Sequence, residues 1–149
     1  EVSWSDVSFA EASPPAGRKV RLAAVHYVPL GKTPQANCEQ FAPLIAEAAR
    51  QRADLVVLPE TLTQANTGKS YLECAEPIPG PSTEYFGGLA KQHNLYLVVG
   101  LIERAEHLIY NVAVLIGPDL PVARHQAALR ELCFGRAAAA HAVAATPTP

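Results

Sequence analysis

The chain has 149 residues, of which 49% are hydrophobic and 17% are charged, and its formal net charge is −2. This length is enough for one domain with a moderate core, and the composition is typical of a globular protein rather than a disordered one. Lysines and arginines form no stripe, which argues against nucleic acid as a partner. No apolar run is long enough to cross a bilayer, which argues against a membrane partner.

The three cysteines, Cys38, Cys74 and Cys133, are widely spaced and form no CxxC pair. This pattern predicts neither a disulfide scaffold nor a zinc knuckle, so we expect a reducing, cytoplasmic compartment. The five histidines show no ligand spacing, and the sequence contains no GxGxxG or Walker loop. We therefore expect no metal and no cofactor.

Residues 1–17 show no sustained periodicity and end in the stretch Ser13–Gly17, which contains two prolines and a glycine. We predict that they form a linker or the end of a preceding domain. Trp4 and Phe9 either pack on the surface of this domain or complete the preceding one. Because the chain has no methionine and begins at Glu1, we expect it to be part of a longer protein.

A strand–helix–strand unit comes next, with strands predicted over Lys19–Tyr27 and Asp54–Leu58 and a helix over about 33–52. Pro43 is costly in the interior of a helix, so the helix either begins near Cys38 or is kinked at the proline. A crossover of this kind makes its two strands parallel. The sequence therefore predicts an α/β fold.

Glu60 directly follows the second of these strands. Within Asp54–Leu58, the four residues after the aspartate form a short, unbroken apolar run of the kind buried in a parallel sheet, and Pro59 should end it because proline cannot donate a ladder hydrogen bond. Ligands of open α/β sheets bind at the carboxyl ends of the strands. Glu60 is therefore either a catalytic carboxylate or a surface carboxylate that caps the next segment.

The chain then predicts a long polar loop over Thr61–Pro81 and a second helix, capped by Ser82 or Thr83 and ending near Asn94. Two further apolar runs predict strands over Leu95–Ile102 and Ile109–Ile116. The charged connection 103–107 is short enough for an antiparallel hairpin. The segment Ala123–Gly135 has a composition compatible with a helix, and the alanine run that follows predicts fraying or disorder.

Three stretches in this order, Ala53–Glu60, Leu97–Gly100 and Tyr110–Asn111 with the strand leading to Asp119, resemble the carbon–nitrogen hydrolase (nitrilase/amidase) family. The resemblance covers about Arg18 to Asp119. It implies that the chain is part of a four-layer α-β-β-α sandwich and lacks its second half.

The resemblance also implies a reaction, the hydrolysis of a carbon–nitrogen bond in a small amide or nitrile substrate by a Glu–Lys–Cys triad. In such a triad the carboxylate accepts the proton of the thiol, because a free thiol is only slightly ionised at neutral pH. The lysine faces the negative charge that develops on the intermediate. The family's glutamate carries over to Glu60.

The other two members of the triad do not carry over. Ala127 stands where the family has its lysine, and no lysine follows Lys91. Cys133 follows no apolar strand and comes too soon after Glu60, so we interpret it as a structural cysteine. Glu131 is a weak match to a supporting glutamate of the family. We therefore expect the chain by itself to be inactive.

We expect a truncated hydrolase domain over residues 18–120 and a divergent, alanine-rich, partly disordered tail over 121–149, the product of truncation or a shifted reading frame. A sheet without its second half exposes an apolar face, which predicts association into homo-oligomers. One alternative is a catalytically dead scaffold or association module that retains the fold. Another is a flavodoxin-like binder of small molecules, which requires a phosphate-binding glycine loop that the sequence lacks.

Overall fold

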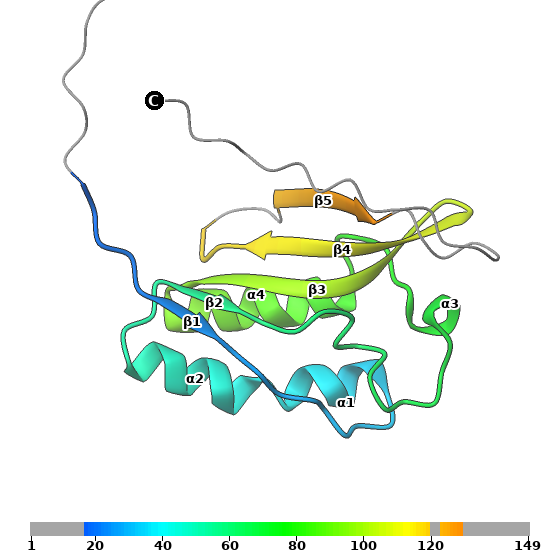
Figure 1. Ribbon diagram of the computed structural model, residues 1–149, viewed down its shortest axis with the longest axis horizontal. Coiled ribbons are helices and arrows are strands. Elements are labelled where there is room, and N and C mark those ends of the chain that lie inside the picture. The colour runs from blue at the N-terminus through cyan, green and yellow to red at the C-terminus, as the bar shows by residue number, and fades with distance from the viewer. Residues whose placement is uncertain (1–16, 120–122, 130–149) are drawn as a thin grey trace, which may run out of the picture.

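The computed structural model describes residues 17–119 and 123–129. Its helices pack on one face of a five-stranded sheet with the strand order β1-β2-β3-β4-β5 (Figure 1). The elements in chain order are β1 (Leu22–Ala24), α1 (Pro34–Glu39), α2 (Ala42–Arg50), β2 (Leu55–Val57), α3 (Tyr71–Cys74), α4 (Pro81–His93), β3 (Tyr96–Ala105), β4 (Leu108–Ile116) and β5 (Ala123–Leu129).

The first three strands of the sheet are parallel, and β4 and β5 are antiparallel to their neighbours. The chain crosses from β1 through α1 and α2 to β2, where Leu22 pairs with Leu55, which confirms the predicted parallel crossover. Both strands are shorter than expected. Each has three residues, inside the predicted ranges Lys19–Tyr27 and Asp54–Leu58.

The single helix expected over 33–52 is two helices. Pro43 lies in the first turn of α2, where its missing N–H costs no hydrogen bond, and the residues before it form the separate helix α1. Thr33 caps α1, its Oγ1 accepting a hydrogen bond from Ala36 N at 3.1 Å. Pro43 therefore lies in a first turn, but the helix that contains it begins at Ala42 and not near Cys38.

The long loop expected over Thr61–Pro81 contains the short helix α3. Its start is a capping box in which Glu73 N donates to Ser70 Oγ (3.3 Å) and Ser70 N donates to the Glu73 carboxylate (2.8 Å). The spacing of Ser70 and Glu73 is a helix-start signal that was readable in the sequence. Outside α3, a single parallel bridge between Glu76 and Glu103, and Pro81, which begins α4, the segment is turns and irregular backbone, as expected.

Helix α4 begins earlier than predicted. Gly80 is its N-cap, so the expected cap at Ser82 or Thr83 is wrong. Pro81 occupies the first turn, where its fixed φ already suits the helix, and this moves the start toward the N-terminus. The predicted end is confirmed, because Asn94 takes the left-handed conformation (φ 50°) that closes many helices.

The strands β3 and β4 form the predicted antiparallel hairpin, but its connection is shorter than expected. Only Glu106 and His107 lie between them, and Ala105 pairs with Leu108. Glu103, predicted to lie in the charged connection, is part of β3 and is 2% exposed.

The helix suggested for Ala123–Gly135 is wrong over its first seven residues. Ala123–Leu129 is the strand β5, which pairs with β4 from the Leu115 level to the Asn111 level. Alanine favours a helix, but the edge of β4 offers backbone hydrogen bonds, and the pairing of β5 with this edge overrides that local preference. The disorder expected farther along the tail lies outside the described residues.

The core lies between the helices and one face of the sheet. That face contributes Val56, Leu97, Val99, Leu101, Val112, Val114 and Ile116. The opposite face leaves Leu22 (66% exposed), Val57 (38%) and Tyr96 (39%) accessible, so the exposed apolar face that was predicted is present. The fold is α/β, with one helix layer and one sheet of the four-layer sandwich.

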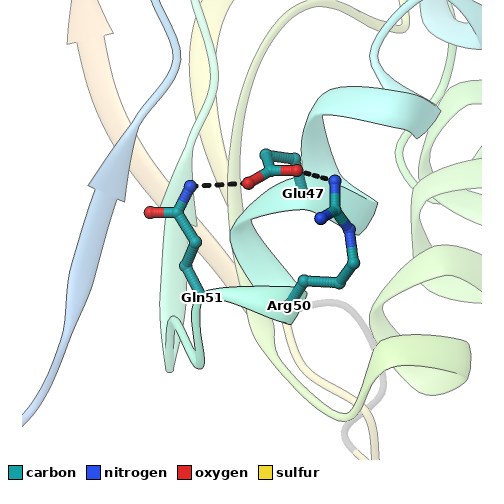
Figure 2. Close-up of polar contacts among 3 residues, drawn as sticks. All are labelled: Glu47, Arg50 and Gln51. Carbon is teal, nitrogen blue, oxygen red and sulfur yellow. Dashed lines mark hydrogen bonds and ion pairs between the residues drawn. The ribbon is translucent and has the colours of Figure 1, made fainter.

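The outer surface of α2 carries polar contacts that contribute little to this packing. The Glu47 carboxylate accepts a hydrogen bond from Gln51 Nε2 at 2.7 Å and pairs with Arg50 (Figure 2). The ion pair is largely exposed, and such pairs are worth about 0–1 kcal/mol. Among the described residues, no helix has the length and apolarity needed to cross a membrane.

Candidate functional site

Glu60 lies shortly beyond the end of β2, where the chain still runs beside β3. Leu58 N donates to Val98 O at 2.9 Å and Leu62 N donates to Gly100 O at 3.2 Å. Glu60 is therefore held between two main-chain attachments to β3, at the carboxyl end of a parallel strand.

The approach of this segment to β3 requires a glycine. A Cβ atom at position 100 would lie 2.5 Å from Glu60 Cα and 2.6 Å from Pro59 O, and neither backbone atom can move freely. Thr61, the next residue, has φ 47°, which is uncommon for a residue other than glycine. Such strain persists where the surroundings hold it, often at functional sites.

The Glu60 side chain is exposed, but it is fixed by a neighbour on β4. Asn111 Nδ2 donates a hydrogen bond to Glu60 Oε1. In the β3–β4 register Asn111 pairs with Ile102, on the sheet face opposite the helices. The carboxylate therefore points toward β4, across the carboxyl end of β2.

Beside this hydrogen bond lies a cavity of about 120 Å³. Its lining combines polar and apolar side chains, from Glu60, Thr61, Tyr71, Ile102, Ile109, Tyr110 and Asn111. A carboxylate and an amide at the wall of a small, partly apolar cavity can orient a polar small molecule and accept a proton from it.

Neither of the two described cysteines lines this cavity. Cys38 is fully buried between α1 and α4, where its Sγ lies 3.5 Å from Ser82 Oγ, and burial raises the pKa of its thiol to about 11. Cys74 is also buried, at 4% exposure. A thiol with a pKa this high is almost wholly protonated at neutral pH, which makes Cys38 a poor nucleophile.

The residues considered for the other positions of the family's site, Ala127, Glu131 and Cys133, come late in the chain. Ala127 lies in β5, and Glu131 and Cys133 lie outside the described residues. None of the described lysines lines the cavity. The described residues also contain no group of three or more side chains that could hold a metal ion.

Most of the cavity wall was missed in the sequence. Tyr110 and Asn111 were recognised as part of a motif, but the contact between Asn111 and Glu60 was not anticipated, because it depends on the register of the hairpin. Tyr71 comes from the capping-box helix within the expected loop. Ile102 could have been placed opposite Asn111 from the sequence, by pairing the two predicted strands symmetrically about a tight turn at 106–107.

Comparison with known proteins gives consistent results. The family model "Carbon-nitrogen hydrolase" matches residues 21–128. Omega-amidase NIT2 of Xenopus tropicalis is 36% identical over 102 residues, covering 68% of this chain and 37% of that protein. A nitrilase of Pyrococcus abyssi is 35% identical over 103 residues, covering 66% of this chain and 39% of that protein. The chain thus spans under two fifths of the length of these relatives.

Solved structures agree in fold. A CN-hydrolase superfamily protein from Xanthomonas campestris, with an arsenic adduct in its active site, superposes with a TM-score of 0.62 at 24% identity, over 80% of this chain and 50% of that chain. An amidase from Nesterenkonia sp. AN1, solved after addition of acrylamide at its active-site cysteine, gives a TM-score of 0.55 at 18% identity, over 70% and 42% of the two chains. The family match, which spans most of the chain, and this shared fold confirm the expected resemblance: the chain belongs to the carbon–nitrogen hydrolase family.

Proposed function

We propose that this chain provides the general-base part of an active site that hydrolyses the carbon–nitrogen bond of a small amide or nitrile, with Glu60 as the catalytic carboxylate. The observation that carries the proposal is the position of Glu60. Its side chain is bound by Asn111 at the wall of a cavity, at the carboxyl end of a parallel strand. In the reaction Glu60 takes the proton of a cysteine thiol as the sulfur attacks the substrate carbon.

The proposal includes the expectation that the 149-residue chain alone does not turn over substrate. The described cysteines are buried, and Cys38 is held protonated by its raised pKa. Loss of the nucleophile from a comparable catalytic triad lowers the rate by on the order of 10⁶. By family resemblance, the thiol belongs to the part of the relatives that this chain does not match, and Ala127 stands at the position of the lysine. The free thiols of Cys38 and Cys74 support a cytoplasmic location as part of the same proposal.

A second function is favoured by the apolar sheet face. A chain that keeps the fold and exposes Leu22, Val57 and Tyr96 can act as a scaffold or association module without catalysis. This alternative gives Glu60 no chemical role. The two proposals therefore differ in whether the Glu60 carboxylate matters for turnover once a thiol and a lysine are present.

A chimera tests this difference. Residues 21–119, the part of the family match that ends before Ala127, replace the matching segment of the Xenopus tropicalis omega-amidase, so that the rest of that enzyme supplies the lysine and the thiol. We expect ammonia release from an amide substrate, and we expect Glu60→Gln to reduce it by about 10²–10⁴-fold, the usual contribution of a general base. Glu84→Gln, at an exposed position in α4, is the matched control and should retain activity. A folded chimera without activity, or one indifferent to Glu60→Gln, overturns the proposal.

A further inference from the structure

Asn37 ties helix α1 to the turn that follows Glu60. Asn37 is fully buried, and its Nδ2 donates hydrogen bonds to three main-chain oxygens, Leu62 O (3.0 Å), Thr63 O (3.4 Å) and Ala65 O (2.7 Å). These contacts join residues that are 25–28 positions apart in the sequence. Asn37 itself does not line the cavity.

The turn has one main-chain attachment to β3, from Leu62 N to Gly100 O, but the rest of its backbone is irregular. Thr61 (φ 47°) and Asn66 (φ 56°) both take left-handed conformations. Its internal main-chain hydrogen bonds, Gln64 N to Thr61 O and Thr67 N to Gln64 O, close single turns and build no helix. A segment with little regular hydrogen bonding is readily displaced unless other residues hold its carbonyl groups.

The Asn37 side chain is itself held in one orientation. Asn37 Oδ1 packs closely against Gly31, where a Cβ atom would lie only 2.5 Å away. The Nδ2 side of the same amide is hydrogen-bonded to the turn. Its Oδ1 meets no hydrogen-bond donor among the described residues. Burial of a polar group is costly without partners, so the three bonds made by Nδ2 account for the amide at this buried position.

The position of the turn fixes that of the carboxylate. Glu60 precedes Thr61 directly, whereas its partner Asn111 belongs to β4 and is held by the hairpin ladder. A shift of the turn therefore moves Glu60 relative to Asn111. We propose that Asn37 is a positioning residue of the active site: from the helix layer, it keeps the Glu60 carboxylate in contact with Asn111. This proposal rests on the proposed role of Glu60.

The competing role for Asn37 is purely structural. In that case its replacement lowers the stability of the fold but leaves the contact between Glu60 and Asn111 intact. Stability measurements alone do not separate the two roles, because both predict a loss. The decisive quantity is the coupling between position 37 and the Glu60–Asn111 pair.

Nuclear magnetic resonance of the full 149-residue chain measures this coupling without any turnover. The reporter is the Asn111 side-chain amide resonance, assigned with an Asn111→Asp variant. In the parent chain, Glu60→Gln removes the charge that Asn111 contacts and should shift this resonance. In an Asn37→Asp background, we expect the same Glu60→Gln change to shift it by less than a third as much. Asn66→Asp is the matched control, since Asn66 Nδ2 also donates to a main-chain oxygen, Pro29 O at 2.9 Å.

An unchanged shift in a folded Asn37→Asp chain overturns the proposal, and so does an equal reduction in the Asn66→Asp chain. If circular dichroism shows that Asn37→Asp does not fold, Asn37→Ser and Asn66→Ser take their places with the same criteria. Because the experiment measures no catalysis, its failure is distinct from failure of the proposed function, which the chimera tests.

Discussion

The backbone of Glu60 packs directly against Gly100 of β3. A Cβ atom at position 100 would lie 2.5 Å from Glu60 Cα, so only glycine fits there. The proposed catalytic carboxylate is thus placed by the absence of a side chain on a neighbouring strand. Gly100 is buried, and the atoms it faces are main-chain atoms, which cannot rotate away as a side chain can. The close packing of Gly100 against Glu60 therefore makes the position of the carboxylate depend on the packing of the sheet.

Gly100→Ala should therefore destabilise the protein by about 1–3 kcal/mol, the usual cost of forcing an extra group into a packed interior. Urea unfolding followed by circular dichroism measures the effect. Gly88→Ala is the matched control, because no atom lies within 4 Å of the position of its Cβ and it is in the interior of α4. The control should be stabilised by about 0.5–1 kcal/mol. Equal stability of the Gly100→Ala chain and the parent would contradict the close approach.

The burial of Cys38 predicts a dependence of stability on alkaline pH. Burial raises the pKa of its thiol from 9.0 to about 11, so the folded state holds this proton where the unfolded state has lost it. The stabilisation that this thiol contributes to the free energy of unfolding is therefore fully present below pH 9, and the free energy of unfolding declines as the pH rises toward 11. The total loss is roughly 2–3 kcal/mol, from 1.36 kcal/mol per pKa unit.

Urea unfolding at several pH values between 8 and 11 tests this prediction, with Cys38→Ala as the reference. The Cys38→Ala chain lacks the titrating thiol, so its free energy of unfolding should decline less as the pH rises. The difference in free energy of unfolding between the two chains should therefore become smaller at higher pH. Parallel curves for the two chains would show that Cys38 does not titrate as its burial requires.

The exposed apolar face predicts association of the chain. The three accessible side chains Leu22, Val57 and Tyr96 lie on adjacent strands, on the sheet face opposite the helices. We expect concentration-dependent oligomers in sedimentation velocity experiments, and we expect the double substitution Leu22→Ser with Tyr96→Ser to shift the chain toward monomer.

Leu72→Ser with Leu108→Ser is the matched control for this experiment. These leucines are 55% and 38% exposed, but they lie in α3 and at the start of β4, away from Leu22 and Tyr96. The control pair should leave the oligomeric state unchanged. A parent chain that stays monomeric throughout the concentration range would rule out association through this face.

The sequence was sufficient for the central part of the fold, since its signals there are local. The apolar runs around Val56, Leu97 and Val114 are long enough to mark strands. The helical segment between the predicted strands Lys19–Tyr27 and Asp54–Leu58 requires a crossover. The predicted start of α4 was too late because Pro81 was assigned to the loop, although proline is common in the first turn of a helix. The break between α1 and α2 was not anticipated, because Pro43 indicates a first turn but does not exclude a helix before it. The strand β5 was missed because its pairing with β4 overrides the preference of its alanines.

The candidate site was predictable only at Glu60, which a strand, a proline and a family pattern mark together. Asn111 reaches Glu60 through strand register, and Asn37 reaches the following turn from a helix more than 20 residues earlier. In a sequence, a single asparagine in a helix is most simply interpreted as an exposed polar residue. Its burial and its three acceptors become visible only when α1 is placed against the turn.

The most direct test of the account is the kcat/KM of the omega-amidase chimera carrying residues 21–119, compared before and after Glu60→Gln. A carboxylate that removes the thiol proton should make the substituted chimera about 10²–10⁴-fold slower, while Glu84→Gln stays within about twofold of the parent. A Glu60→Gln chimera with the kcat/KM of the unsubstituted chimera would show that this carboxylate takes no part in the reaction.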